Sequence, residues 1–521
     1  MIVSAVRRSA RLFAGLGGVV LLLAACTGGS AEDPPEGGPP TTLPVPTSSA
    51  TSEQASDPAF ARFYEQQPAW EPCGERVECS TVTVPVDWDS PDGETLELAV
   101  VRRPADGQRT GSLLMNPGGP GASGVDYVAD YGESSTTRTL REAYDLVGFD
   151  PRGVGESEPV DCLDDAEMDA YLAMDVDPTT PEGIEQMRAE AEEFAAGCAQ
   201  DAGELLANVD TVSAARDMDV LRAVLGDERL NYLGKSYGTL LGAVYAELFP
   251  QRVGRLVLDG ALDPTLSYAE VGIGQARGME QALRAYVEDC PARETCPLRG
   301  DVEDGLEQVR SVIRTAEERP LRTEDAGRPL TSSLAFYGLV APLYDDASWP
   351  VLDEALEQAF VGDGSGLLRI ADIYSDRQPD GSYASNLLEA FNAVNCLDYP
   401  VDASPETMAQ VAQQLQEASP TFGEALAYGE VLCDAWPVEP VGLPESLDAE
   451  GAPPVLVVGT TGDPATPYEW SVALAEQLDG ARLLTWDGEG HTAYMRGSAC
   501  VDAAVDAYLV DGVLPGDGAT C

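Results

Sequence analysis

A glycine-flanked serine is the first group in this sequence whose type and surroundings suggest a nucleophile. Residues 234–238 read Gly-Lys-Ser-Tyr-Gly and fit the pattern G-x-S-x-G. An apolar run at 230–233 that favours a strand precedes the motif, and a run at 240–249 that favours a helix follows it. In that context the glycines permit a sharp turn that lifts a hydroxyl above the edge of a sheet. We therefore predict Ser236 as a nucleophile; the alternative is a plain turn of small residues.

A serine hydroxyl needs a base to take its proton, and the sequence offers only one imidazole. His491 is the single histidine of the chain and lies in the segment Gly-Glu-Gly-His-Thr at 488–492. This segment follows a run at 482–486 that is typical of a strand, so the histidine is expected at a strand end, as the serine is. We predict His491 as the general base.

The imidazole in turn needs a carboxylate that fixes its tautomer and stabilises its charged form. Asp463 follows the apolar run at 454–459, the last expected strand before that of the histidine. The order Ser236, Asp463, His491 is the order found in α/β hydrolases. Asp259 also ends an expected strand and is the alternative acid.

A tetrahedral intermediate needs backbone N–H donors for its oxyanion. The N–H of Tyr237, next after the nucleophile, is one expected donor. The second is expected from the Asn-Pro-Gly-Gly-Pro-Gly run at 116–121, which follows an early strand, with Gly119 as the donor. A run of this composition could also be a simple turn.

Apolar runs that each end in turn residues set the expected architecture. Such runs occur at 80–86, 96–102, 112–116, 144–149, 230–233, 255–258, 454–459 and 482–486. Helical patterns lie between several of them, which favours an α/β fold with a mostly parallel sheet flanked by helices. The alternation stops near residue 263, and the pattern to about 448 is helical. We predict a hydrolase core of residues 57–262 and 449–521, interrupted by a helical cap at 263–448 that covers the carboxyl edge of the sheet.

The N-terminus carries the features of an exported protein. Three arginines precede an apolar stretch that ends in Leu-Ala-Ala-Cys at 23–26, which resembles a bacterial lipobox. We predict a signal peptide at 1–25, lipidation of Cys26 and a Pro/Gly/Ser-rich tether at 26–56; an ordinary cleavage site is the alternative. The mature protein would then be a lipoprotein on the outer face of the cell membrane, or secreted.

Ten cysteines remain when Cys26 is set aside, and an exported chain favours disulfides. The sequence does not determine their pairing. Pairing in sequence order is the simplest arrangement: Cys73 with Cys79, Cys162 with Cys198, Cys290 with Cys296, Cys396 with Cys433, and Cys500 with Cys521. Zinc is not indicated, because the chain has no C-x-x-C pair and one histidine.

The charge of the chain limits its partners. It has 521 residues, 44% of them hydrophobic, with 31 Lys and Arg against 89 Asp and Glu and a net charge of −58. Such a surface repels phosphate backbones and anionic lipids, so we expect no nucleic acid and membrane contact only through the N-terminal lipid. No metal or organic cofactor is implied, and we expect a monomer. The only lysine, Lys235, stands beside the proposed nucleophile without an evident role.

Five motifs together resemble the secreted tripeptidyl-aminopeptidase family of actinomycetes, α/β hydrolases related to prolyl aminopeptidases. They are NPGGPGASG, GFDPRGVGES, YLGKSYGTLLG, TTGDPATP and GEGHTAY, and the resemblance runs from about residue 60 to the end. It implies a triad of Ser236, Asp463 and His491, an oxyanion hole at Gly119 and Tyr237, and cleavage of short pieces from free peptide N-termini. The histidine of the family's HGGPG motif is Pro117 here, which leaves the backbone donors in place.

An exopeptidase must recognise the α-ammonium of its substrate, and a carboxylate in the cap meets that requirement. Asp398, two residues after Cys396, is our hypothesis for this contact; the alternative is a solvated surface acid.

Three functions remain open from the sequence. The first is a serine exopeptidase that releases di- or tripeptides or single residues through an acyl-enzyme. The second is a carboxylesterase or lipase, because the same triad serves esters. The third is a non-catalytic binding lipoprotein, which would not need a complete set of catalytic groups.

Overall fold

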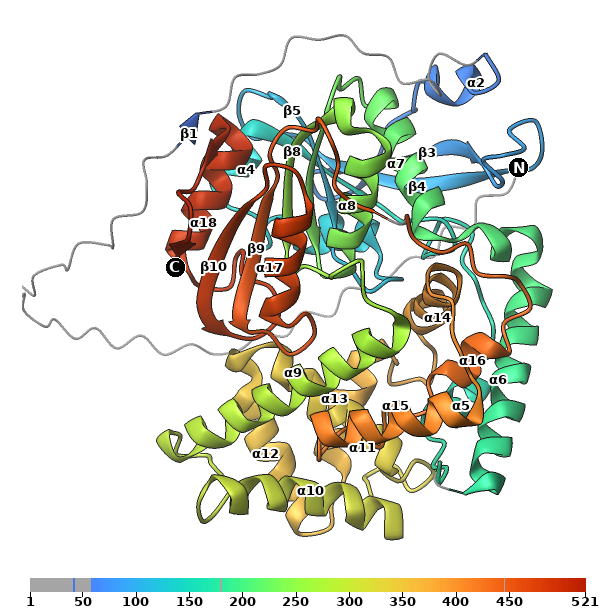
Figure 1. The fold of residues 1–521 in the computed structure, drawn as a ribbon, viewed down its shortest axis with the longest axis vertical. Helices are drawn as coiled ribbons and strands as arrows, with labels where there is room; N and C mark the ends of the chain where they lie inside the picture. Colours follow the sequence, from blue (N-terminus) through green and yellow to red (C-terminus); the bar gives the residue numbers. More distant parts are fainter. Residues whose placement is uncertain (1–40, 43–57, 179, 445) are drawn as a thin grey trace, which may run out of the picture. The chain divides into compact units, whose positions relative to one another are not determined.

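The computed structural model describes residues 41–42, 58–178, 180–444 and 446–521. The predicted signal peptide, Cys26 and all but two residues of the predicted tether lie outside these ranges. The described residues belong to one compact unit (Figure 1). None of the helices within them is both long and apolar enough to cross a bilayer.

A mostly parallel sheet forms the core of the molecule. The order of its strands in the described chain is β12-β10-β9-β8-β7-β5-β6-β4-β3-β2. The first seven strands in this order, β12 to β6, all pair in parallel with their neighbours. Strand β4 joins β6 antiparallel and continues antiparallel to β3 and β2. The bounds are β2 Glu71–Gly74, β3 Val77–Pro85, β4 Thr95–Arg103, β5 Gly111–Asn116, β6 Tyr144–Phe149, β7 Leu230–Lys235, β8 Val253–Asp259, β9 Leu456–Gly462, β10 Arg482–Glu489 and β12 Ala519–Thr520. Apart from this sheet, β1 (Thr41–Thr42) pairs with β11 (Val513–Leu514).

The central strands are apolar throughout because both faces of the sheet are covered. Successive side chains of a strand point to opposite faces, so Leu113 and Met115 join one core cluster while Leu114 joins the other. One face is covered by α3 (Gly124–Tyr131), α4 (Arg138–Ala143) and α18 (Ala499–Asp506), and the other by α2 (Ala61–Tyr64), α7 (Thr211–Val224), α8 (Tyr237–Leu248) and α17 (Tyr468–Gln477). This is the α/β-hydrolase fold expected from the sequence.

The cap consists of helices that lie beyond the carboxyl edge of the sheet, below it in Figure 1. Helix α10 illustrates why these segments are helical: it starts with a capping box from Asp301 and Asp304 and buries Leu306, Val309 and Val312 on one face. The cap helices between β8 and β9 are α9 Tyr268–Asp289, α10 Val302–Glu318, α11 Ser332–Val340, α12 Trp349–Phe360, α13 Ser365–Tyr374, α14 Leu387–Asp398, α15 Pro405–Ala418 and α16 Glu430–Asp434. Short helical turns are η1 Gly203–Asn208, η2 Pro250–Arg252, η3 Cys290–Ala292, η4 Ala341–Tyr344, η5 Asp346–Ser348 and the π-helical η6 Ala507–Asp511.

A second segment, assigned to the core by the sequence, packs against the cap. Helices α5 (Asp165–Leu172) and α6 (Pro181–Ala202) follow β6, and Ala191 of α6 shares a buried cluster with Met408 and Val431 of the cap. The alternation of strands and helices gave no sign of this, because helical periodicity does not show which layer a helix joins. The cap is therefore built from two stretches of the chain.

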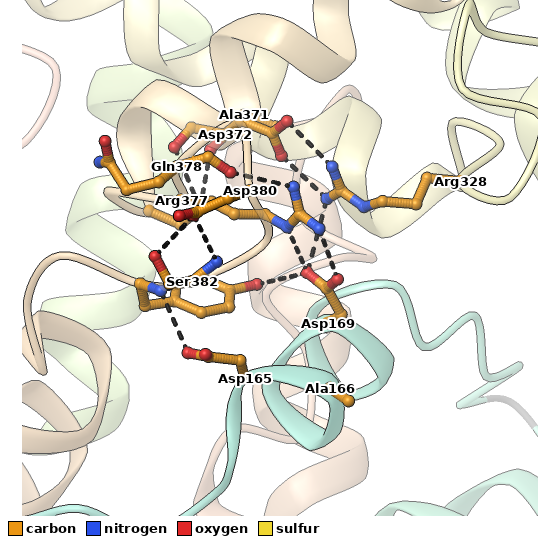
Figure 2. Close-up of polar contacts among 12 residues, drawn as sticks. Asp165, Ala166, Asp169, Arg328, Ala371, Asp372, Arg377, Gln378, Asp380 and Ser382 are labelled. Carbon is orange, nitrogen blue, oxygen red and sulfur yellow. Dashed lines mark hydrogen bonds and ion pairs between the residues drawn. The ribbon is translucent and has the colours of Figure 1, made fainter.

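A cluster of charged side chains joins these two stretches (Figure 2). Arg377 donates to both oxygens of Asp169 in α5, at 2.5 and 2.7 Å, and the hydroxyl of Tyr383 donates to the same carboxylate at 2.8 Å. Arg328 forms a matching two-pronged pair with Asp372 of α13, at 2.9 and 2.8 Å. Burial raises the pKa of Asp169, but the donors around it hold that pKa below its usual value. Asp169 is therefore the charged centre that ties α5 to the cap.

All ten described cysteines form disulfides, in the five pairs given by sequence order. Cys162–Cys198 closes the second cap segment, and Cys396–Cys433 joins α14 to α16. Beside the first of these, the carboxylate of Glu389 accepts the backbone N–H groups of Cys162 and Leu163. Burial is the main influence on Glu389 and raises its pKa to about 7, although the two N–H donors oppose this.

We predict that Asp169→Asn weakens the attachment of α5 to the cap. The change leaves Arg377 without its paired charge, so the free energy of unfolding in urea should fall by about 1–3 kcal/mol. Asp380→Asn is the matched control. Asp380 is an exposed acid in the loop that carries Arg377, and its side chain bonds only to nearby Ser382. Equal effects of the two substitutions would contradict this role of Asp169.

We also predict that Glu389 makes the free energy of unfolding depend on pH. Its pKa of about 7 in the folded state lies above that of an unfolded glutamate, about 4.3. The folded state therefore binds the proton more tightly, so this group lowers the free energy of unfolding as pH rises from about 4 to 7. Urea titrations across this range should show a smaller fall for Glu389→Gln than for the wild type. The exposed-site variant Glu439→Gln should follow the wild type; an unchanged slope in Glu389→Gln would refute the prediction.

Candidate active site

The three predicted catalytic side chains follow strands of one parallel array. Ser236 comes directly after β7, Asp463 directly after β9, and His491 two residues after β10. Strands β7, β8, β9 and β10 are neighbours in the sheet, and all run parallel. Their carboxyl ends meet at one edge, so all three residues lie at the edge that the cap covers.

The serine lies at the sharp turn that its motif predicts. Its backbone has φ 55° and ψ −126°, a conformation that L-residues rarely adopt and that costs of order 1–3 kcal/mol. Both flanking glycines are sterically required. A Cβ on Gly234 would lie 2.3 Å from the carbonyl oxygen of Gly238, and a Cβ on Gly238 would lie 2.8 Å from Oδ1 of Asn116. The turn places Ser236 at the N-terminus of α8.

The buried Asp463 and the partly buried His491 form a hydrogen-bonded pair. Nδ1 of His491 lies 2.9 and 3.0 Å from the two carboxylate oxygens. Asp463 is only 3% exposed and also accepts the backbone N–H groups of Ala465, Thr466 and Thr492. Burial raises the pKa of Asp463, yet the imidazole and these donors bring it below its usual value. A charged carboxylate thus fixes the ring by Nδ1 and leaves Nε2 for a second partner.

Asp259, the alternative acid, has a different place. It ends β8, between the strands of Ser236 and Asp463, and its carboxylate accepts the N–H groups of Ala493 and Tyr494 at 2.9 Å each. Its backbone oxygen accepts the N–H of Ser236 at 3.0 Å. The imidazole is paired with Asp463 instead, so Asp259 holds the histidine loop through its backbone.

Lys235 takes part in the same arrangement. It pairs with Asp259 in the register of β7 and β8, and its Nζ donates to the carbonyl oxygen of Tyr494 at 2.9 Å. Burial raises the pKa of Asp259, and the positive charge of Lys235 lowers it. This role was not predicted from the sequence, although the only lysine of the chain, next to the proposed nucleophile, was a signal that could have led to it.

The glycine-rich loop lies directly on the serine turn. A Cβ on Gly118 would lie 2.8 Å from Cβ of Ser236 and 3.3 Å from the nitrogen of Tyr237. Gly118 donates its own N–H to Oδ1 of Asn116. Among the residues described, the N–H groups of Gly119 and Tyr237 donate to no protein acceptor. These are the two donors that the sequence proposed for an oxyanion.

Asp398 lies apart from this edge, behind the side chain of Tyr237. It is 2% exposed, and Thr211 donates to both of its oxygens, from N at 2.9 Å and from Oγ1 at 2.5 Å. The Thr211 hydroxyl also contacts the hydroxyl of Tyr237 at 2.6 Å. Burial raises the pKa of Asp398 to about 7, against the effect of the Thr211 donors. The surface-acid alternative is wrong, and the proposed substrate contact stays a prediction.

The cap contacts the predicted catalytic histidine through an aromatic residue, Tyr344, that the sequence did not indicate. The carbonyl oxygen of Tyr344 accepts the N–H of His491 at 2.9 Å, and the two rings meet edge to face with centroids 5.3 Å apart. Arg496 donates to the carbonyl oxygens of both residues. Tyr374 and Tyr337 continue the series of rings into the cap. Across the described ranges, no cluster of three or more His, Cys, Asp or Glu residues is arranged to hold a metal ion.

Comparisons with known proteins agree with this geometry. Residues 419–521, which include Asp463 and His491, match a family model described as TAP-like protein. The chain is 39% identical over 455 residues to the serine protease Hip1 of Mycobacterium tuberculosis, covering 85% of this chain and 87% of that one. It is 41% identical over 496 residues to carboxylesterase B of the same organism, covering 91% and 94%.

A third relative has the name of the family that the sequence motifs resemble. The tripeptidyl aminopeptidase of Streptomyces lividans is 33% identical over 466 residues, covering 87% of this chain and 86% of its own. Among solved structures, a proline iminopeptidase of Mycobacterium smegmatis is 15% identical with a TM-score of 0.34, covering 82% of this chain and 97% of that one. With relatives 33–41% identical over most of its length, the chain belongs to the tripeptidyl-aminopeptidase-like family of serine hydrolases with the α/β-hydrolase fold.

Proposed function

We propose that the protein is a serine exopeptidase that releases di- or tripeptides from free N-termini of peptides. The observation that carries this proposal is the hydrogen-bonded Asp463–His491 pair at the same sheet edge as the strained Ser236. Relatives named as a serine protease and a tripeptidyl aminopeptidase support the peptidase reading. The cap supports an exopeptidase, since a covered edge favours the end of a chain over its middle.

The reaction proceeds by acyl transfer. Ser236 Oγ attacks the scissile carbonyl while Nε2 of His491 takes the hydroxyl proton, and Asp463 stabilises the imidazolium that forms. The N–H groups of Gly119 and Tyr237 bind the oxyanion. The imidazolium then gives its proton to the leaving amine, and a water molecule activated by the same imidazole releases the acyl group from Ser236.

Two other features belong to the proposal. Lipidation at Cys26 and export would place a monomeric enzyme outside the cell, where it meets peptide substrates. Its acidic surface suits neither nucleic acid nor anionic lipid, which leaves the N-terminal lipid as the membrane contact.

A carboxylesterase is the second candidate, favoured by the relative that carries this name. Amide and ester hydrolysis use the same nucleophile, base and oxyanion donors. A non-catalytic binding lipoprotein is disfavoured, because binding alone gives no reason to keep the Asp463–His491 pair and a strained serine.

A substrate panel tests the function. We expect kcat/KM for a tripeptidyl p-nitroanilide with a free N-terminus to exceed that of its N-acetyl form by about 100-fold, since an exopeptidase must desolvate and pair the ammonium. Ser236→Ala should lower kcat by at least about 10³-fold and abolish labelling by a fluorophosphonate. The exposed-site variant Ser134→Ala is the control. Efficient ester cleavage with no preference for the free amine would instead establish the esterase.

We predict that Lys235 positions the histidine loop. Lys235→Met removes the charge beside Asp259 and the donor to Tyr494, so kcat should fall about 10–100-fold with little change in KM. The chain has one histidine, so an NMR spectrum of a tag-free preparation reports on His491 alone, and its ring resonances should shift or broaden. Lys235→Arg should recover part of the activity. A methionine variant with wild-type kcat and an unchanged imidazole spectrum would exclude this role.

A further inference from the structure

One motif of the sequence, GFDPRGVGES at 148–157, lies outside the proposed triad and oxyanion hole. It contains Asp150, which directly follows β6 and is 1% exposed. Arg152 of the same motif forms its ion pair with Asp217, and both of these side chains are fully buried. No Lys or Arg within the described ranges pairs with Asp150. Hydrogen-bond donors must therefore compensate its charge, because a buried carboxylate without partners is costly.

Three donors reach the two carboxylate oxygens of Asp150. Oδ1 accepts the hydroxyl of Ser123 at 2.6 Å and the N–H of Val125 at 3.1 Å. Oδ2 accepts the N–H of Glu156 at 2.9 Å. Burial raises the pKa of Asp150, and the three donors oppose this. One carboxylate thus joins the start of α3 to the loop that follows β6.

The start of α3 is also the end of the glycine-rich loop, residues 117–123, which is the oxyanion loop of the proposed mechanism. The other end of this loop is held after β5, where Gly118 donates its N–H to Oδ1 of Asn116. Between these two attachments, Gly118, Gly119 and Gly121 have φ values of 105°, 105° and 97°. Glycine restricts the backbone less than any other residue. The direction of the Gly119 N–H therefore depends on how the two ends of the loop are held.

The cap holds the loop of Asp150 from a second side. Asn386, which directly precedes α14, accepts the N–H of Gly155 at 3.0 Å. Its amide nitrogen donates to the carbonyl oxygens of Gly153 and Val160, at 2.9 Å each. Gly155 lies against Asp150, since a Cβ on this glycine would lie 2.3 Å from Oδ2 of the carboxylate. The position of the carboxylate is thus determined by the core and the cap together.

We propose that Asp150 is a positioning residue for the oxyanion hole: it holds the glycine-rich loop through Ser123 and Val125, so that the N–H of Gly119 points at the oxyanion. This inference rests on the proposed acyl transfer to Ser236. Asp150 acts through the loop and not on the reacting atoms. An oxyanion exists only after attack on the carbonyl, so a displaced donor lowers the stability of the transition state and leaves substrate binding unchanged.

The experiment compares turnover with the binding of a tetrahedral adduct. The wild type and Asp150→Asn are assayed with a tripeptidyl p-nitroanilide and inhibited with a tripeptidyl boronic acid, whose adduct with Ser236 places an oxygen in the oxyanion hole. The asparagine keeps one acceptor oxygen but brings an NH2 group to a position that needs an acceptor. Loss of a whole oxyanion donor costs about 10²–10³-fold in kcat, so a displaced one should cost about 30–100-fold, with KM within about twofold. The Ki of the boronic acid should rise by a similar factor.

Asp353→Asn is the matched control. Asp353 is a buried acid of α12 whose bonds to Arg293 and Thr295 lie within the cap. This variant should keep the kcat and the boronic-acid Ki of the wild type. Unchanged values in Asp150→Asn, or changes no larger than those in Asp353→Asn, would overturn the proposal.

The single histidine separates this role from damage to the fold. Within the described chain, no printed contact of the His491 ring involves the glycine-rich loop. An NMR spectrum of tag-free Asp150→Asn should therefore keep the His491 ring resonances of the wild type. If it does not, Ser123→Ala decides, because it removes one bond to the loop and leaves Asp150 its other two donors. This variant should lower kcat and raise the Ki about 3–10-fold, and wild-type values in it would overturn the proposal.

A p-nitrophenyl ester keeps the inference distinguishable from the exopeptidase function. A wild type that cleaves only the ester would refute the exopeptidase. A fall of kcat for the ester in Asp150→Asn would then still support the positioning role, and an unchanged kcat would overturn it. A wild type that cleaves neither substrate and does not bind the boronic acid would refute the proposed function and this inference together.

Discussion

The relative position of the proposed nucleophile, Ser236, and the proposed base, His491, depends on a buried carboxylate between them. Asp259 accepts the N–H of Ser236 through its backbone oxygen and two N–H groups of the histidine loop through its side chain. It is fully buried, and a buried anion is stable only where donors and an opposite charge surround it. The only lysine of the chain lies beside it in register and bonds to the same loop. Asp259 is not a member of the proposed triad, but it holds Ser236 and the histidine loop in the positions that the triad needs.

The cap is connected to both halves of this arrangement. On one side, Tyr344 accepts the N–H of His491, and Arg496 holds the two segments together. On the other side, α14 packs on Gly121 of the oxyanion loop. Asp169 binds α5 to the cap, and Ala191 of α6 packs on Met408 and Val431. The cap is therefore a scaffold of two chain segments that contacts both the histidine and the glycine-rich loop. A substrate held by the cap is thereby placed in a fixed relation to the reacting groups.

The sequence allowed the proposed catalytic residues to be predicted better than the helices and polar contacts that hold them in place. A single histidine and a G-x-S-x-G motif between a strand and a helix leave few alternatives, and the strand runs are found within a few residues of their predicted bounds. The disulfides have the pairing in sequence order that was the simplest arrangement, although the sequence did not determine it. The place of α5 and α6 could not be predicted, because a helix of 22 residues can cover a sheet or join a cap with the same periodicity.

Single polar residues were harder still. Asp398 has the type expected of a substrate contact, but its contact with Thr211 depends on a residue 187 positions away. The role of Lys235 becomes visible only once its neighbours are known, because it lies beside the buried Asp259. Burial and pairing, which decide the role of a charged group, are properties of the packed structure rather than of local sequence.

Relatives of similar identity carry the names of a protease and of a carboxylesterase, and the site explains why both are compatible with one fold. In the proposed mechanism, attack by Ser236 forms the same tetrahedral oxyanion whether the leaving group is an amine or an alcohol, and the N–H groups of Gly119 and Tyr237 bind it in both cases. Preference between the substrates must therefore come from groups that hold the acyl part before the reaction. In this chain the cap covers the sheet edge at which Ser236, Asp463 and His491 lie, so we expect those groups to come from the cap. We therefore infer that the sheet edge supplies the reacting groups and that the cap helices decide between the substrates.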